Sequence, residues 1–293
     1  MNTRRSFLKN AAIVTPAMLF LPDMLLAARK KGEVGIQLYT LRDLISKDPK
    51  GVLDKVAAAG YKKIEMFGYG QGKFFGIPVK EFAAYANSLG LVSPSGHYLP
   101  QSFLYEESEK GEAEMKDMIA AAVEMKHEYL VIPWLHTERR QNLDDYKKIA
   151  ARLNVAGELC KNAGIQMAYH NHDFEFKSYD GTTGFDVFSK ETDANLVKWE
   201  LDLYWVVFAG LDPINLFNQH KGRVPLWHVK DMDKVKREQN TEIGNGSIDY
   251  KRIFKAAGVA GLKHFYVEQE NNYVPEPIGS IQSSIKYIKA NLV

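Results

Sequence analysis

The chain has 293 residues, of which 45% are hydrophobic and 25% are charged. A chain of this length and composition buries enough apolar surface to fold without disulfides or a structural metal. The 38 basic and 36 acidic side chains nearly cancel, which argues against a dedicated nucleic-acid binder, because such proteins carry a basic excess. The single cysteine, Cys160, cannot form an internal disulfide, and its place near a predicted helix end indicates a structural role.

Residues 1–28 are predicted to be an export signal and not part of the fold. The pair Arg4 and Arg5 precedes an apolar stretch that ends at Ala28, and this order resembles a twin-arginine signal. Two prolines and Asp23 interrupt the stretch, whereas a membrane-spanning helix needs about 20 nearly uninterrupted apolar residues. We therefore expect an exported, periplasmic protein that comprises residues 29–293 and has no membrane anchor after removal of the signal.

Short apolar runs with β-branched residues alternate with longer stretches of helical period along the rest of the chain. The predicted strands are Gly35–Tyr39, Lys63–Phe67, Leu91–His97, Tyr129–Pro133, Ile165–Asn171, Val197–Leu203, Leu226–Lys230 and His264–Gln269. Helices are predicted over 49–59, 78–89, 109–126, 144–163, 249–257 and 277–292, and another begins at Asp212 and Pro213. Asp48 caps the first helix and Gly60 follows its end, as helix termini prefer.

The alternation repeats every 30 to 35 residues or so, which is typical of βα units around a parallel sheet. Eight such units fit a closed (β/α)8 TIM barrel, which has about 250 residues. No glycine-rich phosphate-binding motif follows an early strand, which argues against a dinucleotide-binding fold. We predict a single α/β domain over residues 29–293.

Polar residues lie at the ends of the last four predicted strands, and a parallel barrel brings such ends to one face. The residues are His170, Asp202, His228 and Glu268. Isolated buried charges are costly, so their recurrence at four successive strand ends favours a site. Imidazole and carboxylate ligands suit zinc, manganese, iron or cobalt without selecting one of them. The sequence therefore predicts a site at this face, in which one or two imidazoles together with the aspartate and the glutamate can bind a divalent cation.

A bound metal ion polarises a hydroxyl or carbonyl group and lowers the barrier to proton removal at the neighbouring carbon. Lys230 lies on the same side of its strand as His228 and can act as an acid or a base, or stabilise negative charge. His172 lies on the same side as His170 and is a ligand, the partner of a ligand or, as we favour, a substrate contact. Candidate catalytic residues are thus His172, Lys230 and Glu268.

Further candidates come from the earlier strands. The residues predicted to contact the substrate are Glu65, His97, Trp134 and His136. Glu65 has an alternative as a residue of the barrel interior that is paired with a base. The tryptophans can stack on a sugar or fill the core. Trp205 and Trp227 can likewise stack on a sugar or fill the core. His127 and His220 are expected to interact with helix dipoles. His264 is expected at the opposite end of the barrel.

Several segments in this order resemble the xylose-isomerase-like sugar isomerase/epimerase superfamily, and in particular its exported bacterial branch. The segments are GIQLYTLRD (35–43), GYKKIE (60–65), YHNHDFEF (169–176), LD (201–202), HVKD (228–231) and GNGSID (244–249). The resemblance implies a barrel with one divalent cation, commonly manganese, bound by side chains from the last four strands. Residue by residue, it implies that His170, Asp202, His228 and Glu268 are the ligands, with Mn²⁺ as the first candidate and Zn²⁺, Co²⁺, Fe²⁺ or Mg²⁺ as alternatives.

His170 stands where many members of this superfamily have glutamate. In ketose 3-epimerases two glutamates move the proton on either side of the epimerised carbon, and this chain keeps only Glu268. The departure disfavours a symmetric two-carboxylate mechanism. Members with a similar Tyr-His-Asn-His strand resemble 3-keto-glycoside lyases or hydrolases, which eliminate the aglycone after proton abstraction beside the ketone.

Three hypotheses follow from the sequence. The first is a metal-dependent lyase or hydrolase that acts on an unphosphorylated keto sugar or 3-keto-glycoside by abstracting a proton next to a carbonyl. The second is a sugar isomerase or epimerase with the same metal site, and the third is a non-catalytic periplasmic carbohydrate-binding barrel. Export favours unphosphorylated substrates, because sugar phosphates are cytoplasmic, and it leaves no place for a nucleic-acid partner. The formation of a homo-oligomer stays open.

Overall fold

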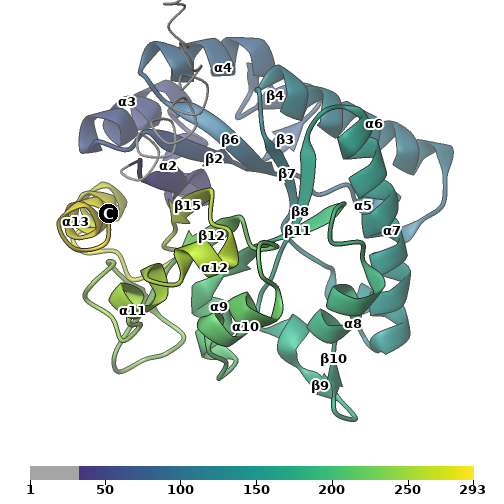
Figure 1. Ribbon diagram of the computed structural model, residues 1–293. Helices are drawn as coiled ribbons and strands as arrows, with labels where there is room; N and C mark the ends of the chain where they lie inside the picture. The colour runs from purple at the N-terminus through teal and green to yellow at the C-terminus, as the bar shows by residue number, and fades with distance from the viewer. Residues whose placement is uncertain (1–32) are drawn as a thin grey trace, which may run out of the picture. The chain divides into compact units, whose positions relative to one another are not determined.

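A computed structural model describes residues 33–293, and Figure 1 shows a ring of helices around central strands. The predicted export signal, 1–28, lies outside the described residues. Residues 34–293 form one compact unit. None of the helices in the described part of the chain is long and apolar enough to cross a membrane.

Eight parallel strands close into a barrel in the order β1-β15-β12-β11-β8-β7-β6-β2. Their bounds are β1 Gly35–Gln37, β2 Lys63–Met66, β6 Val92–His97, β7 Tyr129–Ile132, β8 Gln166–His170, β11 Val197–Asp202, β12 Leu226–Val229 and β15 His264–Val267. Gly35 pairs with both Lys63 of β2 and Tyr266 of β15, which closes the sheet. The predicted α/β barrel is therefore confirmed, and each of these strands lies within its predicted range.

The longer helices cover the outside of the barrel. They are α3 Pro49–Ala59, α4 Val79–Ser88, α6 Glu109–Glu124, α7 Leu143–Asn162, α8 Gly184–Glu191, α10 Pro213–Gln219 and α13 Pro277–Asn291. The C-terminal helix α13 packs against α3, so the last helix lies beside the first long one (Figure 1). The helix predicted over 249–257 is instead two short helices, α11 Tyr250–Phe254 and α12 Ala257–Ala260.

Local sequence signals explain where several of these helices begin and end. The Asp48 side chain accepts a hydrogen bond from the Gly51 amide at the start of α3, and Gly60 ends that helix with a φ of 97°. A positive φ of this kind favours glycine, which has no Cβ to clash with the preceding turn.

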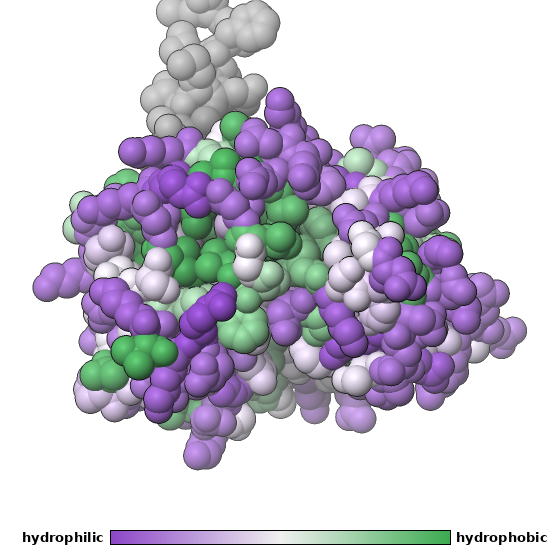
Figure 2. Space-filling model, turned by 90° about the horizontal axis from the view of Figure 1, so that it is seen from below, coloured by the Kyte–Doolittle hydropathy of each residue, from purple (hydrophilic) through white to green (hydrophobic). Residues whose placement is uncertain are grey.

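Short elements fill the connections between the barrel strands and the long helices. The short helices are α2 Arg42–Ile45, α5 Gln101–Tyr105 and α9 Leu203–Phe208, with 3-10 turns at Leu38–Leu41, Thr137–Arg139 and Phe174–Phe176. The short strands are β3 Tyr69–Gly70, β4 Lys73–Phe74, β5 Ile77–Pro78, β9 Ser178–Tyr179, β10 Thr182–Thr183, β13 Asp231–Met232 and β14 Asn240–Thr241. Figure 2 shows one face of the molecule, where hydrophobic residues gather near the middle and hydrophilic residues surround them.

Alternation along the strands separates two kinds of interior. On β12, Trp227 is fully buried and stacks on Phe217 of α10 with ring centroids 4.8 Å apart, so it belongs to the layer between barrel and helices. A small separate apolar cluster contains Leu226 of the same strand and Tyr266 of β15. His228 follows Trp227 on the opposite side of the strand, because successive side chains of a strand alternate. This alternation aims polar strand-end residues into the barrel while the tryptophan packs outside it.

His127, which we expected to interact with a helix dipole, follows the end of α6, and its side chain is buried. Its Nε2 lies 2.9 Å from Ser93 Oγ, and its Nδ1 lies 3.3 Å from the Tyr98 hydroxyl. Burial lowers the pKa of His127 to about 3, because the charged imidazolium would lose its hydration. The folded protein therefore holds this histidine neutral.

We predict that His127→Gln removes part of the acid sensitivity of the fold. Between pH 6.5 and 3 the unfolded chain protonates His127 and the folded chain does not, so stability is lost as the pH falls. The stability difference between wild type and variant, measured by urea unfolding, should therefore shrink by about 2 kcal/mol from pH 7 to pH 5. A difference that does not change with pH would contradict the assignment.

Candidate active site

Four side chains predicted as metal ligands meet at the carboxyl end of the barrel. His170 ends β8, Asp202 ends β11, His228 lies on β12, and Glu268 follows β15. The possible ligand atoms of Asp202, His228 and Glu268 all lie within 4.8 Å of one another. His170 Nε2 is 3.8 Å from Asp202 Oδ2, so the fourth residue lies beside the other three. All four side chains are buried.

The backbone around Asp202 fixes the direction of its carboxylate. Asp202 Oδ1 accepts hydrogen bonds from the amides of Tyr204 and Trp205 and thereby caps helix α9. The Asn171 side chain in turn accepts a hydrogen bond from the Asp202 amide at 3.0 Å. These bonds occupy one carboxylate oxygen and leave Oδ2 directed toward the site.

Lys230 places a cation among three carboxylates. Its Nζ lies 2.9 Å from Asp202 Oδ2 and 3.0 Å from Glu268 Oε2, and it also contacts Glu270. Burial by itself would lower the pKa of Lys230, but the charges of Asp202, Glu268 and Glu270 outweigh it and raise the pKa well above the usual value. The side chain is therefore an ammonium group, although it is only 1% exposed.

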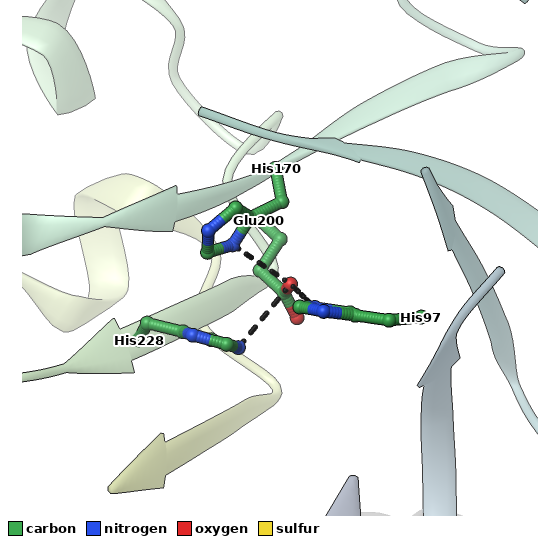
Figure 3. A group of neighbouring side chains, drawn as sticks. All are labelled: His97, His170, Glu200 and His228. Carbon is green, nitrogen blue, oxygen red and sulfur yellow. Dashed lines mark hydrogen bonds and ion pairs between the residues drawn. The ribbon is translucent and has the colours of Figure 1, made fainter. Parts of the chain in front are cut away.

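Beneath the four predicted ligands lies a second polar layer. Glu200 and Glu65 are both fully buried there. In Figure 3, His97, His170 and His228 point toward the carboxylate of Glu200. Glu200 Oε2 lies 2.7 Å from His97 Nε2, 3.1 Å from His170 Nδ1 and 3.3 Å from His228 Nε2.

The two carboxylates of this layer differ in their ionisation. Burial and the charge of Glu200 raise the pKa of Glu65 to about 7. Burial acts on Glu200 too, but the charges of His228 and His97 outweigh it and hold the pKa of that carboxyl well below its usual range. Two buried carboxylates side by side are compensated by histidine N–H groups, as buried charges require.

A cavity of about 750 Å³ opens above the site. His97, His170 and Glu268 are among its polar lining residues, and aromatic side chains, including Tyr39, Phe67, Tyr69, Tyr98, Trp134 and Trp205, supply much of the wall. No lysine or arginine is among the described residues that line it.

His172 lies in the cavity wall among aromatic rings. Its ring packs edge-on against Trp134 at 4.7 Å between centroids and parallel to Phe174 at 5.3 Å. Its Nδ1 is buried and makes no hydrogen bond to any residue that the structure describes. Burial, with the nearby charges of His170 and Lys230, holds the pKa of His172 well below its usual value. The ring is thus neutral and has an unpartnered nitrogen.

Two residues predicted to contact the substrate lie elsewhere. Glu65 lies below the cavity, where its Oε2 is 2.6 Å from His228 Nε2, and this contact corresponds to the alternative of a carboxylate paired with a base in the barrel interior. His136 is not among the lining residues, because its ring turns toward Tyr105, 5.7 Å away between centroids. His97 and Trp134 do line the cavity. The sequence analysis left open whether Trp205 faces the site, and it does.

Glu200 and Glu270 were missed in the sequence analysis. Glu200 precedes Asp202 by two residues on β11, and this spacing, which singled out His172 beside His170, would have placed it on the same side of the strand. Glu270 lies beyond the end of β15, two residues after Glu268. Its contact with Lys230 joins residues far apart in the sequence, so no local pattern indicates it.

The donor set fits a divalent cation. Asp202 and Glu268 offer carboxylate oxygens, and His228 Nδ1 lies 2.7 Å from Glu268 Oε2, with His170 Nε2 next to Asp202. Mixed imidazole and carboxylate ligands suit manganese, zinc, iron or cobalt. Asp202, Glu268 and Glu270 face the single ammonium of Lys230, so negative charge is in excess where a divalent cation would balance it.

A closed barrel of eight parallel strands with a polar site at their carboxyl ends places the protein in the class of TIM-barrel proteins. The chain belongs to the xylose isomerase-like TIM barrel family, whose model matches residues 53–291. It is similar to a sugar phosphate isomerase/epimerase from Parabacteroides distasonis of known structure, with 30% identity and a TM-score of 0.77 over 89% of this chain and 94% of that one.

Among curated proteins the chain is similar to inosose dehydratases. It is 28% identical to that of Clostridium beijerinckii over 166 residues, which cover 50% of this chain and 55% of the relative. It is 27% identical to that of Clostridium perfringens over 213 residues, which cover 63% of this chain and 71% of the relative. The match thus spans about half the length of the first relative and more of the second.

We predict that Lys230→Met destabilises the metal-free protein by about 3–5 kcal/mol, because it removes the cation from a buried group of carboxylates. Added Mn²⁺ should restore part of the loss, since a cation that binds only the folded chain raises its stability. Urea unfolding with chelator and with Mn²⁺ measures both effects. In the control, Lys50→Met, the broken ion pair with Glu81 is exposed, so a loss below about 1 kcal/mol is expected. Equal losses in the two variants would contradict the prediction.

Proposed function

We propose that the protein is a divalent-metal-dependent enzyme that abstracts a proton next to the carbonyl of an unphosphorylated keto sugar or 3-keto-glycoside and eliminates the neighbouring substituent. The observation that carries the proposal is the group formed by Asp202, His228 and Glu268, with Lys230 among them, at the base of an aromatic-walled cavity. The similarity to inosose dehydratases supports an elimination on a keto compound.

The proposed cofactor is one divalent cation, with Mn²⁺ as the first candidate, bound by His170, Asp202, His228 and Glu268. When bound, it would polarise the substrate carbonyl and stabilise the negative charge that develops on its oxygen. Three protein ligands within reach of one point, and a fourth beside them, leave room for substrate oxygens, as catalytic metal sites require.

His172 is the proposed base. Its ring lines the cavity and is neutral, so one of its nitrogens has a lone pair that can accept the proton from carbon. The two electrons of the broken C–H bond form the new carbon–carbon double bond as the leaving oxygen departs. Trp134 and Phe174 pack against the ring and hold its orientation.

Lys230 is the proposed acid, because its ammonium group carries the proton that the leaving oxygen needs. Its carboxylate neighbours Asp202, Glu268 and Glu270 hold it in place. Glu268 is a proposed metal ligand and also the remaining candidate for the base. Separate variants of His172, Lys230 and Glu268 distinguish the base, the acid and the ligand.

The cavity favours a substrate without phosphate. Phosphate sites in proteins use lysine, arginine or a glycine-rich loop, and no lysine or arginine is among the described residues that line the cavity. Aromatic walls such as Trp134 and Trp205 suit the apolar faces of sugar rings and attached groups. We therefore propose a neutral carbohydrate as the small-molecule partner.

A sugar isomerase or epimerase that uses the same site is the second candidate. The similarity to the sugar phosphate isomerase/epimerase from Parabacteroides distasonis favours it. Both reactions begin with proton removal next to a carbonyl and differ in whether a substituent then leaves. An epimerase of the two-carboxylate type needs a second carboxylate that returns the proton to the opposite face of the substrate carbon. Position 170 carries an imidazole instead, and for this reason we place elimination first.

We also propose that the protein acts outside the cytoplasm, on the basis of the arginine pair and apolar stretch within residues 1–28. Replacement of Arg4 and Arg5 by lysine should block export, because the pair is read by a receptor. Fractionation of the producing cells followed by N-terminal sequencing tests this, and the mature chain is expected to begin near residue 29. Wild-type protein found only in the cytoplasm with residues 1–28 attached would contradict the proposal.

Incubation of Mn²⁺-loaded protein with a 3-keto-glucoside of 4-nitrophenol is expected to release 4-nitrophenol, and a chelator should stop the release. His172→Gln should lower kcat by about 10² to 10⁴-fold, since it removes the base. His136→Gln, whose side chain lies outside the cavity lining, is the matched control and should retain the wild-type rate.

The other outcomes decide between the hypotheses. Solvent deuterium in recovered sugar without loss of the aglycone would indicate an isomerase or epimerase. Tight sugar binding that neither chelator nor Asp202→Ala affects would indicate a binding protein. Absence of turnover with any divalent metal would overturn the lyase proposal.

A further inference from the structure

Three imidazoles converge on one carboxylate oxygen beneath the proposed metal site. Figure 3 shows His97, His170 and His228 around Glu200, and the three nitrogens lie 2.7, 3.1 and 3.3 Å from Glu200 Oε2. The other oxygen, Oε1, is buried and makes no hydrogen bond to any described residue. Glu200 thus depends entirely on the histidines for its compensation.

The hydrogen bonds restrict which ring nitrogens carry protons. A carboxylate can only accept, so the nitrogen of each histidine that faces it must be the N–H. For His170 this is Nδ1, which leaves the lone pair of Nε2 toward Asp202 Oδ2, 3.8 Å away. For His228 it is Nε2, which lies 2.6 Å from Glu65 and 3.3 Å from Glu200. Its Nδ1 faces Glu268 Oε2 at 2.7 Å and carries a proton too in the metal-free protein, so a cation at the site would displace that proton.

His97 completes the arrangement through its Nε2. Its Nε2 lies 2.7 Å from Glu200 Oε2 and 3.3 Å from Glu65 Oε2, and its ring stacks on that of His228 at 5.2 Å and 8°. Two carboxylates and two stacked imidazoles therefore hold one another in place.

We propose that Glu200 is a positioning residue of the metal site: it orients His170 and His228 and holds a proton on the ring nitrogen of each that faces it, so that the other nitrogen of each ring can bind the cation. Glu65 also contacts His228 Nε2 and helps to orient that ring. The inference rests on the proposed metal site but not on the reaction. Carboxylate partners of histidine ligands act in this way in metalloproteins, and their loss typically costs 10–100-fold in metal affinity.

The same cluster has a competing explanation as a second cation site, because the ligand atoms of His97, His170, Glu200 and His228 lie within 4.8 Å of one another. A cation there would need the very nitrogens whose N–H groups compensate Glu200 and Glu65. Contacts of 2.6 and 2.7 Å are hydrogen-bond distances for charged partners, which favours protons in these positions. We therefore expect one cation per chain.

The test measures Co²⁺ binding by competition with a coloured chelator, together with the visible absorption of the bound Co²⁺. Glu200→Gln is expected to weaken binding by about 10–100-fold and to change the absorption, because the amide cannot compensate three N–H donors. The matched control is Glu242→Gln, another buried carboxylate, whose hydrogen-bond donors include Ser280 and the Val274 amide, and it should keep the wild-type affinity. In a His170→Ala background the effect of Glu200→Gln should become smaller.

Long-range ¹H–¹⁵N NMR on the metal-free wild type keeps the proposal testable if Glu200→Gln fails to fold. His170 is expected to carry its proton on Nδ1, and a proton on Nε2 alone would overturn the inference.

Four other outcomes would overturn the inference. They are wild-type affinity in Glu200→Gln, the same loss with and without His170, two Co²⁺ ions per wild-type chain of which one disappears in Glu200→Gln, and a wild type that binds no Co²⁺. The last outcome would overturn the metal-dependent function as well, whereas Co²⁺ binding without turnover would overturn only the proposed reaction.

Discussion

The compensation of buried charge at the carboxyl end of the barrel is the constraint on which the rest of this site depends. Glu65, Glu200, Asp202 and Glu268 are all buried there, and each would be costly without a partner. Lys230 compensates Asp202 and Glu268 in the upper layer, and histidine N–H groups compensate Glu200 and Glu65 in the lower one. The positions of Lys230 and of the histidines are therefore set by the carboxylates that they must contact.

His228 connects the two layers. Its Nε2 faces Glu65 below and its Nδ1 faces Glu268 above, so any change in the lower layer alters how the ring meets the upper one. His170 has the same arrangement, with Glu200 on one nitrogen and Asp202 near the other. The imidazole of His170 is thus backed by a buried glutamate, and the two residues act together at the site.

The cavity has a polar floor and an aromatic wall, and the two proton-transfer candidates lie in these different surroundings. The proton-transfer candidates His172 and Lys230 differ in environment, since one ring lies among aromatic side chains and the other group among carboxylates. These environments push their pKa values in opposite directions, which holds the imidazole neutral and the amine charged. In the proposed elimination the neutral imidazole would accept a proton and the ammonium group would donate one.

The sequence by itself determined the fold and the identity of most polar residues at the strand ends, because the hydrophobic period of strands and helices is local and a parallel barrel has only one way to gather those ends. His170, Asp202, His228 and Glu268 could be named for that reason. Only the tertiary structure decided how deep each side chain lies and what faces it: Glu65 below the cavity, His136 turned toward Tyr105, Trp227 outside the barrel, and Glu200 under three histidines. Depth and partners depend on the register between strands and on the rotamers of packed neighbours, which are properties of residues far apart in the chain.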